Sequence, residues 1–90
     1  MTDLNQLRED IRTVDNEILV LLRKRRDLAR AVGEYKASHG REVRDLSVED
    51  GVVRRYREFA EENGMDPDKA EAVCRLVMEE SVDVQEAIRR

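Results

Sequence analysis

One helical stripe constrains this chain more than any other feature. Apolar residues recur at alternating spacings of three and four from Leu4 to Tyr35, which places them on one face of a continuous helix. The stripe comprises Leu4, Leu7, Ile11, Val14, Ile18, Leu21, Arg25, Leu28, Val32 and Tyr35. Arg25 is its one charged member, and a buried guanidinium needs a compensating anion. We therefore expect either an ion pair with an Asp or Glu of a neighbouring helix or a bound anionic ligand.

The length of this helix predicts a second subunit. The pattern runs from Leu4 to Ser38, with Thr2 or Asp3 as the N-cap. At about 1.5 Å per residue the helix is roughly 50 Å long, whereas a compact chain of this size has a radius of gyration of about 12 Å. The rest of the chain is too short to cover such a rod, so the stripe is expected to pack against another copy.

Two shorter helices are predicted after a loop at His39 to Leu46, which completes an all-α fold in a single domain spanning 1–90. Ser47 is the expected N-cap of the second helix, with Asp50 in a capping-box position. Its apolar stripe contains Val48, Val52, Tyr56 and Phe59.

Asn63-Gly64 is expected to end this second helix, and Asp66-Pro67 to begin the third. The stripe of the third helix contains Ala70, Val73, Val77, Ser81, Val84 and Ile88. Ser81 is its polar interruption, and a serine at such a position usually bonds back to the preceding turn.

Composition narrows the function further. Charged residues make up 42% of the chain, with both signs interleaved and a net charge of −4, which argues against nucleic acid or an anionic membrane as a partner. No apolar run is long enough to span a bilayer. The single cysteine, Cys74, is expected to be a small buried hydrophobe and favours a reduced, cytoplasmic setting. One His, one Cys and scattered carboxylates lack metal-ligand spacing.

Helical geometry suggests which cations could share a ligand with Arg25. Lys36 lies eleven residues on, at nearly the same azimuth and roughly 16 Å away, whereas Arg8 lies about 26 Å away in the other direction. If two such helices pair antiparallel about a centre near residue 20, Arg8 of one subunit faces position 32 of the other, between Arg25 and Lys36. Taken alone, however, Arg8, Lys36 and Gln85 would each count as ordinary surface residues.

Four segments together resemble the all-helical class of chorismate mutases, which are intertwined antiparallel homodimers of three-helix subunits. They are LREDIRTVDNEILVLLRKRRDLA (Leu7 to Ala29), VGEYK (Val32 to Lys36), VRDLSVED (Val43 to Asp50) and EESVDVQ (Glu79 to Gln85). The resemblance implies the rearrangement of chorismate to prephenate in phenylalanine and tyrosine biosynthesis. That unimolecular reaction needs no cofactor, metal or nucleophile.

The resemblance also implies a role for each site residue. Arg25, together with Arg8 of the partner subunit, would pair with the substrate carboxylates, and Ser81 would assist there. Lys36 and Gln85 would donate hydrogen bonds to the ether oxygen of the breaking bond. Asp45, through its backbone, and Glu49 would hold the ring hydroxyl.

One position departs from the family pattern: Val48 stands where an arginine often precedes the glutamate of the second helix. The departure leaves room for a dependence on an activating enzyme of the shikimate pathway. Two other functions also stay open at this point. One is an isochorismate-pyruvate lyase on the same scaffold, and the other is a non-catalytic helical dimerisation module in which Arg25 is simply ion-paired.

Overall fold

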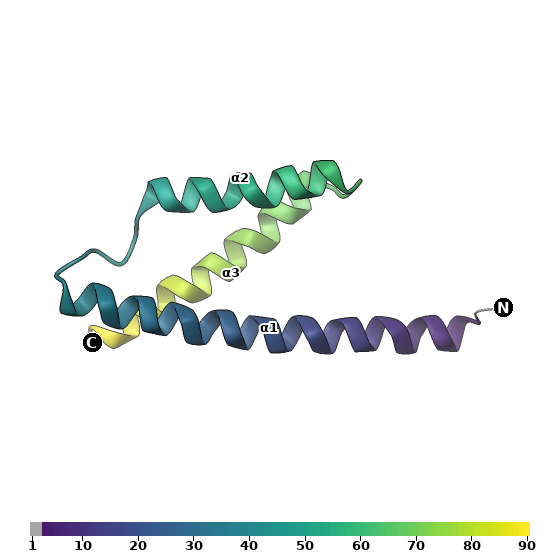
Figure 1. The fold of residues 1–90 in the computed structure, drawn as a ribbon, viewed down its shortest axis with the longest axis horizontal. Helices are drawn as coiled ribbons and strands as arrows, with labels where there is room; N and C mark the ends of the chain where they lie inside the picture. Colours follow the sequence, from purple (N-terminus) through teal and green to yellow (C-terminus); the bar gives the residue numbers. More distant parts are fainter. Residues whose placement is uncertain (1–2) are drawn as a thin grey trace.

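The computed structural model describes residues 3–90 as three helices. They are α1 (Leu4–Ser38), α2 (Leu46–Glu62) and α3 (Pro67–Ile88) (Figure 1). The all-α prediction and the bounds predicted for the long first helix are confirmed. Of the two predicted caps of α1, Thr2 lies outside the described residues, and Asp3 serves as the cap because its carboxylate accepts the Gln6 N–H at 2.8 Å.

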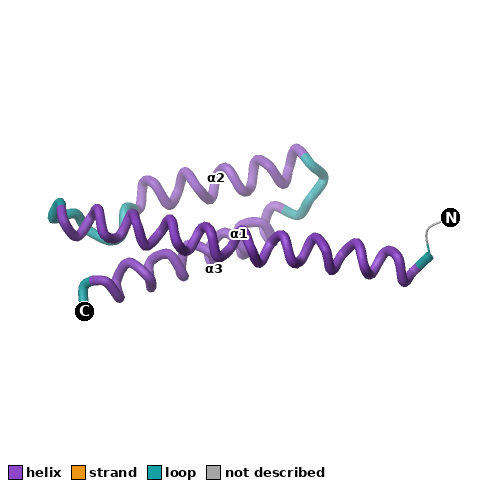
Figure 2. Tube along the Cα trace, turned by 60° about the horizontal axis from the view of Figure 1, so that its bottom comes forward, coloured by secondary structure: helices purple, strands orange, loops and turns teal. Residues whose placement is uncertain are grey.

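The helices form an open arrangement in which α3 contacts both other helices, while α1 and α2 do not contact each other within residues 3–90. The C-terminal part of α3 contacts α1, and the N-terminal part of α3 contacts α2 (Figures 1 and 2). The described chain measures 58 × 24 × 14 Å, and its radius of gyration of 16.5 Å exceeds the compact expectation of about 12 Å. The extended shape follows from α1, whose N-terminal half runs away from α3 and ends past the other two helices (Figure 1).

That projecting half presents its apolar stripe to solvent. Ile11 and Leu21 are each 61% exposed, and their neighbours on the stripe, Leu4, Leu7, Val14 and Ile18, are exposed as well. The described chain thus leaves uncovered the face that the sequence predicts to be buried. No helix within residues 3–90 combines the length and apolar character required to cross a membrane.

The start of α2 differs from the prediction. Asp45, not Ser47, is the N-cap, because its carboxylate accepts the N–H groups of Ser47 and Val48 at 3.1 and 3.3 Å. Ser47 lies inside the first turn, and its hydroxyl donates to the same carboxylate oxygen at 2.8 Å. The helix therefore begins at Leu46, and the capping box predicted for Asp50 does not form. A carboxylate two residues earlier satisfies the free N–H groups instead.

The other predicted helix ends are confirmed. Asn63 ends α2 and is followed by Gly64 in the left-handed region at φ 68°, where the Met65 N–H reaches the Ala60 carbonyl at 2.8 Å. Asp66 caps α3, with Pro67 as its first residue.

The buried line of α3 differs from the predicted stripe. Cys74 is fully buried, as expected, and it shares the buried side with Met78 and Gln85. Val73, a member of the predicted stripe, is exposed. The reason is that α3 packs against helices on two sides, so the position of the two contacts decides which of its residues are covered.

Gly33 sets the distance between α1 and α3 where they cross. A Cβ at this position would lie 2.8 Å from Cγ of Gln85, 2.9 Å from Cδ1 of Ile88 and 3.1 Å from Cα of Gln85. Because one of these atoms belongs to the backbone of α3, a side-chain rotation alone cannot make room. The close crossing of α1 and α3 therefore requires glycine, which has no side chain, at position 33.

We predict that Gly33→Ala lowers the free energy of unfolding by about 1–3 kcal/mol, the usual cost of an overpacked contact. Gly51 is the matched control, since it is also helical but a Cβ there meets nothing within 4 Å. Gly51→Ala should be neutral or stabilise by about 0.5–1 kcal/mol. Chemical denaturation of both variants at one subunit concentration measures the difference, and equal effects of the two substitutions would contradict the crossing argument.

Candidate functional site

A pocket of about 490 Å³ lies between the C-terminal part of α1, the start of α2 and the C-terminal part of α3. Six of the seven residues predicted for the site line it: Arg25, Lys36, Asp45, Glu49, Ser81 and Gln85. They come from α1, α3 and the beginning of α2 with its cap, and are up to sixty residues apart in the sequence. Of these residues, helical spacing had placed Arg25 and Lys36 near one another. The fold adds the residues of α2 and α3.

Arg25 is half-buried and bonded to uncharged groups of α3. Its Nη1 donates to the Val77 carbonyl at 3.1 Å and to the Ser81 hydroxyl. Ser81 also donates back to the Val77 carbonyl at 3.2 Å, as expected for a serine within a helix. Among residues 3–90 no carboxylate forms a salt bridge with Arg25. The internal ion pair considered from sequence is therefore absent from the described chain, and the positive charge at the pocket wall is not neutralised.

Lys36 provides the second cation of the pocket. Its Nζ donates to the Val43 carbonyl at 2.6 Å, which ties the end of α1 to the loop before α2. The loop can turn back at this point because Gly40 adopts φ 62° and the Arg41 N–H reaches the Lys36 carbonyl at 2.8 Å. The ammonium has two further hydrogens, so it can donate to a bound anion while this bond is kept.

Among the site residues, Gln85 differs most in burial from what the sequence alone suggests. Considered alone it would count as a surface residue, yet it is only 7% exposed. Its Oε1 is buried without a hydrogen-bond partner among the described residues. An unsatisfied buried amide costs free energy unless something binds to it. Its position at the Gly33 crossing accounts for the burial, because α1 lies against its Cα and Cγ.

Asp45 and Glu49 form the acidic side of the pocket. Hydrogen bonds from the Ser47 hydroxyl and the Val48 N–H lower the pKa of the Asp45 carboxyl. The cap uses Oδ1 of this side chain, and the Asp45 backbone carbonyl accepts the Glu49 N–H at 3.0 Å. A hydrogen bond from Arg44 lowers the pKa of Glu49, so this carboxylate is ionised at neutral pH.

Arg41 and Arg44 are the cations near the site to which the sequence assigned no role. Arg41 lines the pocket, and Arg44 is bonded to Glu49 from outside the pocket. The sequence offered one signal for Arg41: it directly follows Gly40, at the turn that comes after α1. The contact of Arg44 depends on how the loop turns, which local sequence does not specify.

Arg8 does not join the pocket of its own chain. It lies on the projecting half of α1, seventeen residues or about 26 Å before Arg25. Its contribution in trans therefore stays a prediction that requires a second subunit.

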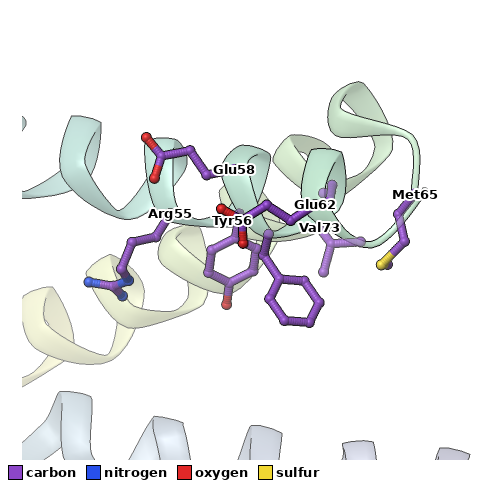
Figure 3. A pocket seen from close by; sticks show the side chains of 9 residues that line it. Arg55, Tyr56, Glu58, Glu62, Met65 and Val73 are labelled. Atoms are coloured by element: carbon purple, nitrogen blue, oxygen red, sulfur yellow. The ribbon is translucent and has the colours of Figure 1, made fainter.

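A larger hollow of about 620 Å³ opens between α2 and α3 at their connected ends. Figure 3 shows Tyr56, Met65 and Val73 along its wall. Arg55 is the one cation among its lining residues, which also include Glu58 and Glu62 and are otherwise largely apolar. Without convergent cations this hollow is less suited to a small anion than the pocket of Arg25 and Lys36.

Comparison with known proteins identifies related chains. The family model "Chorismate mutase type II" matches residues 7–86. The T-protein of Enterobacter agglomerans is 38% identical over 81 residues, which are 90% of this chain but 22% of that protein, so the chain spans about a fifth of this longer relative. The chorismate mutase of Methanocaldococcus jannaschii is 28% identical over 91% of this chain and 83% of its own length.

A solved structure, a conserved hypothetical protein from Pyrococcus furiosus, superposes with a TM-score of 0.77 at 33% identity. The match covers 94% of this chain and 97% of that one. The three-helix arrangement thus occurs elsewhere over nearly the same length.

The cap at the start of α2 generates a test by pH titration. Because the pKa of Asp45 is lowered in the folded chain, its stabilising effect is complete above the unfolded pKa of about 3.9 and is lost as the pH falls through the folded value. The amide ¹⁵N shifts of Ser47 and Val48 should therefore titrate together, with a midpoint below 3.8. In Asp45→Asn, which keeps the cap without its charge, this titration should disappear, and its persistence would assign the shifts to another group.

Proposed function

This chain belongs to the chorismate mutase type II family, and from that membership we propose that it catalyses the rearrangement of chorismate to prephenate. One observation carries the proposal: Arg25 and Lys36 line a single pocket and are bonded only to neutral groups among the described residues. Neither cation forms a salt bridge with the carboxylates of the pocket, so both can pair with a bound anion, and chorismate is a small dicarboxylate.

Each pocket residue has a role in that reaction. Arg25 pairs with a substrate carboxylate, and Ser81 orients the guanidinium by accepting a hydrogen bond from it. To assist at the carboxylate, the Ser81 hydroxyl would turn its one hydrogen from the Val77 carbonyl to the substrate. Glu49 and the backbone of Asp45 hold the ring hydroxyl. These contacts select the folded conformation in which the two reacting carbons approach each other, and this orientation supplies part of the rate enhancement.

The second contribution is electrostatic. As the bond between carbon and the ether oxygen breaks, negative charge grows on that oxygen, and Lys36 and Gln85 donate hydrogen bonds to it. Lys36 is held before the substrate binds by the Val43 carbonyl. The helix crossing at Gly33 confines Gln85 at its Cα and Cγ and so places its amide at the pocket. Donors that need no reorganisation during the reaction stabilise a transition state most effectively.

We further propose that the enzyme is an antiparallel homodimer. The apolar stripe of α1 is exposed along the projecting half, and the hollow between α2 and α3 is apolar and wide enough to receive side chains of a second α1 (Figure 3). Burying both surfaces against another copy removes a large apolar area from water. The same pairing brings Arg8 of the partner subunit to the pocket as a third cation.

Val48 marks where this site departs from the family pattern. It lines the pocket with an apolar side chain at a position that often carries arginine, so the site has one cation fewer around the substrate. We expect weaker substrate binding as the consequence. A dependence on an activating enzyme of the shikimate pathway would appear as a gain in turnover when that enzyme is added.

The first test removes a donor. Lys36→Ala should lower kcat by about 10²–10³-fold, the usual loss when one preorganised donor is removed. Lys24→Ala is the matched control, since Lys24 is exposed on the same helix and does not line the pocket. Chorismate disappearance measures the rate, and near-full turnover by Lys36→Ala would contradict the assignment. Product identification with chorismate and isochorismate separates the mutase from the lyase.

The second test addresses the dimer and Arg8 together. Arg8→Ala and Lys36→Ala subunits should each be inactive alone, whereas mixing them should restore about a quarter of the wild-type sites, because each mixed dimer has one site free of both substitutions. Mixing Lys36→Ala with Gln85→Ala is the control, since every site then carries one defect. Equal results from the two mixtures would rule out a trans contribution from Arg8.

A further inference from the structure

Arg44 binds the carboxylate of Glu49 at two points. Its Nη2 donates to Oε1 at 2.7 Å and its Nε donates to Oε2 at 3.2 Å. The planar guanidinium therefore matches both carboxylate oxygens, which fixes the orientation of the carboxylate as well as its distance. The side chain of Glu49 is 20% exposed and that of Arg44 is 57% exposed, so the carboxylate is the more enclosed partner.

The two residues lie on different sides of the pocket wall. Glu49 lines the pocket of Arg25 and Lys36. It also lines a smaller hollow of about 200 Å³ behind it, together with Arg44, Arg75 and Glu79. Arg44 borders only the outer hollows and not the pocket itself. Of the pocket residues, Glu49 is the one to which the Arg44 side chain is hydrogen-bonded, so Glu49 is the direct route by which Arg44 can affect a ligand.

We propose that Arg44 is a positioning residue that holds the Glu49 carboxylate oriented toward the hydroxyl group of the substrate and keeps it ionised to lower pH. The identity of that substrate rests on the proposed function. An ionised carboxylate only accepts hydrogen bonds, so a fixed and charged Glu49 presents an acceptor to a ligand hydroxyl. Once Glu49 is protonated it also acts as a donor, and this single geometry is lost.

The charges around Glu49 explain why Arg44 matters in this chain. Lys36 from α1 and Arg75 from α3 also lower the pKa of Glu49, but more weakly than the hydrogen bond from Arg44. Glu79 of α3 adds negative charge beside the same small hollow. At the neighbouring position in the helix, Val48 supplies no charge. Arg44 is thus the main group that favours ionised Glu49, and it does so from the loop instead of from α2.

The first experiment compares the pH dependence of kcat/KM in the wild type and in Arg44→Ala. Without Arg44 the pKa of Glu49 rises, so the acid limb of the profile should move to higher pH. At neutral pH the loss should be about fivefold, which matches the upper range for a solvent-facing ion pair. Arg44→Lys keeps the charge but not the two-point contact, so it should fall between the two.

The matched control is Arg54→Ala, which removes the same charge from an exposed position of α2 that does not line the pocket. It should leave the profile unchanged. Placing Arg44→Ala in a Glu49→Gln background should have little further effect, because the group through which Arg44 acts is gone. A uniform loss at all pH values with a lower melting temperature, or an equal loss in both backgrounds, would overturn the proposal in favour of a purely structural role.

A measurement that needs no turnover separates this proposal from the proposed function. The side-chain carboxyl of Glu49 can be titrated by ¹³C NMR in the wild type and in Arg44→Ala. Its midpoint should lie at lower pH in the wild type, and an unchanged midpoint would overturn the proposal. Absence of chorismate turnover by the wild type, with the shifted midpoint still present, would refute the function and leave the Arg44–Glu49 interaction intact.

Discussion

The crossing of α3 over α1 at Gly33 is the contact on which the rest of this structure depends. The two backbones approach so closely that even a Cβ would strike Cα of Gln85. The approach places Gln85 inside the molecule and brings Ser81, one turn earlier, against Arg25. A side chain at position 33 would force Gln85 and Ile88 of α3 to move, and the backbone at Gln85 to give by a few tenths of an ångström, beside the pocket that Gln85 lines. The same helix crossing therefore both stabilises the fold and positions the residues of the pocket.

The electrostatic character of the pocket follows from that crossing. Arg25 is held by a carbonyl and a hydroxyl of α3, which fix its direction without cancelling its charge. Lys36 is held in the same way by the Val43 carbonyl. Because their partners are neutral, Arg25 and Lys36 are held in place and can still pair with a bound anion. Had either been paired with a carboxylate, a ligand would first have to displace that partner, and much of the binding free energy would be lost.

Helix bounds could be predicted from sequence where apolar residues repeat with the period of a helix. The bounds of α1 were predictable because ten positions agree on one period, with Asp3 as a cap before the first of them and a break in the pattern from His39. Prediction failed at the start of α2, where Asp45 and Ser47 are both good caps and the way the loop enters the helix selects Asp45. It also misjudged the burial of Gln85, because a polar residue near a chain end carries no local sign of being covered.

Periodicity and length were enough to establish that this chain forms a helix longer than its remaining residues can cover, with one arginine in the apolar face. Both are local properties, so they can be read along the chain without knowing how distant segments pack. The family resemblance implied that Arg25, Lys36, Ser81, Gln85, Asp45 and Glu49 share one site, but helical periodicity did not, and the contacts that form the pocket became evident only in three dimensions. The contact of Arg44 with Glu49 from behind also became evident only there. Those contacts depend on the angle and closeness of helix crossings, which arise from packing between distant segments and leave no periodic trace in the sequence.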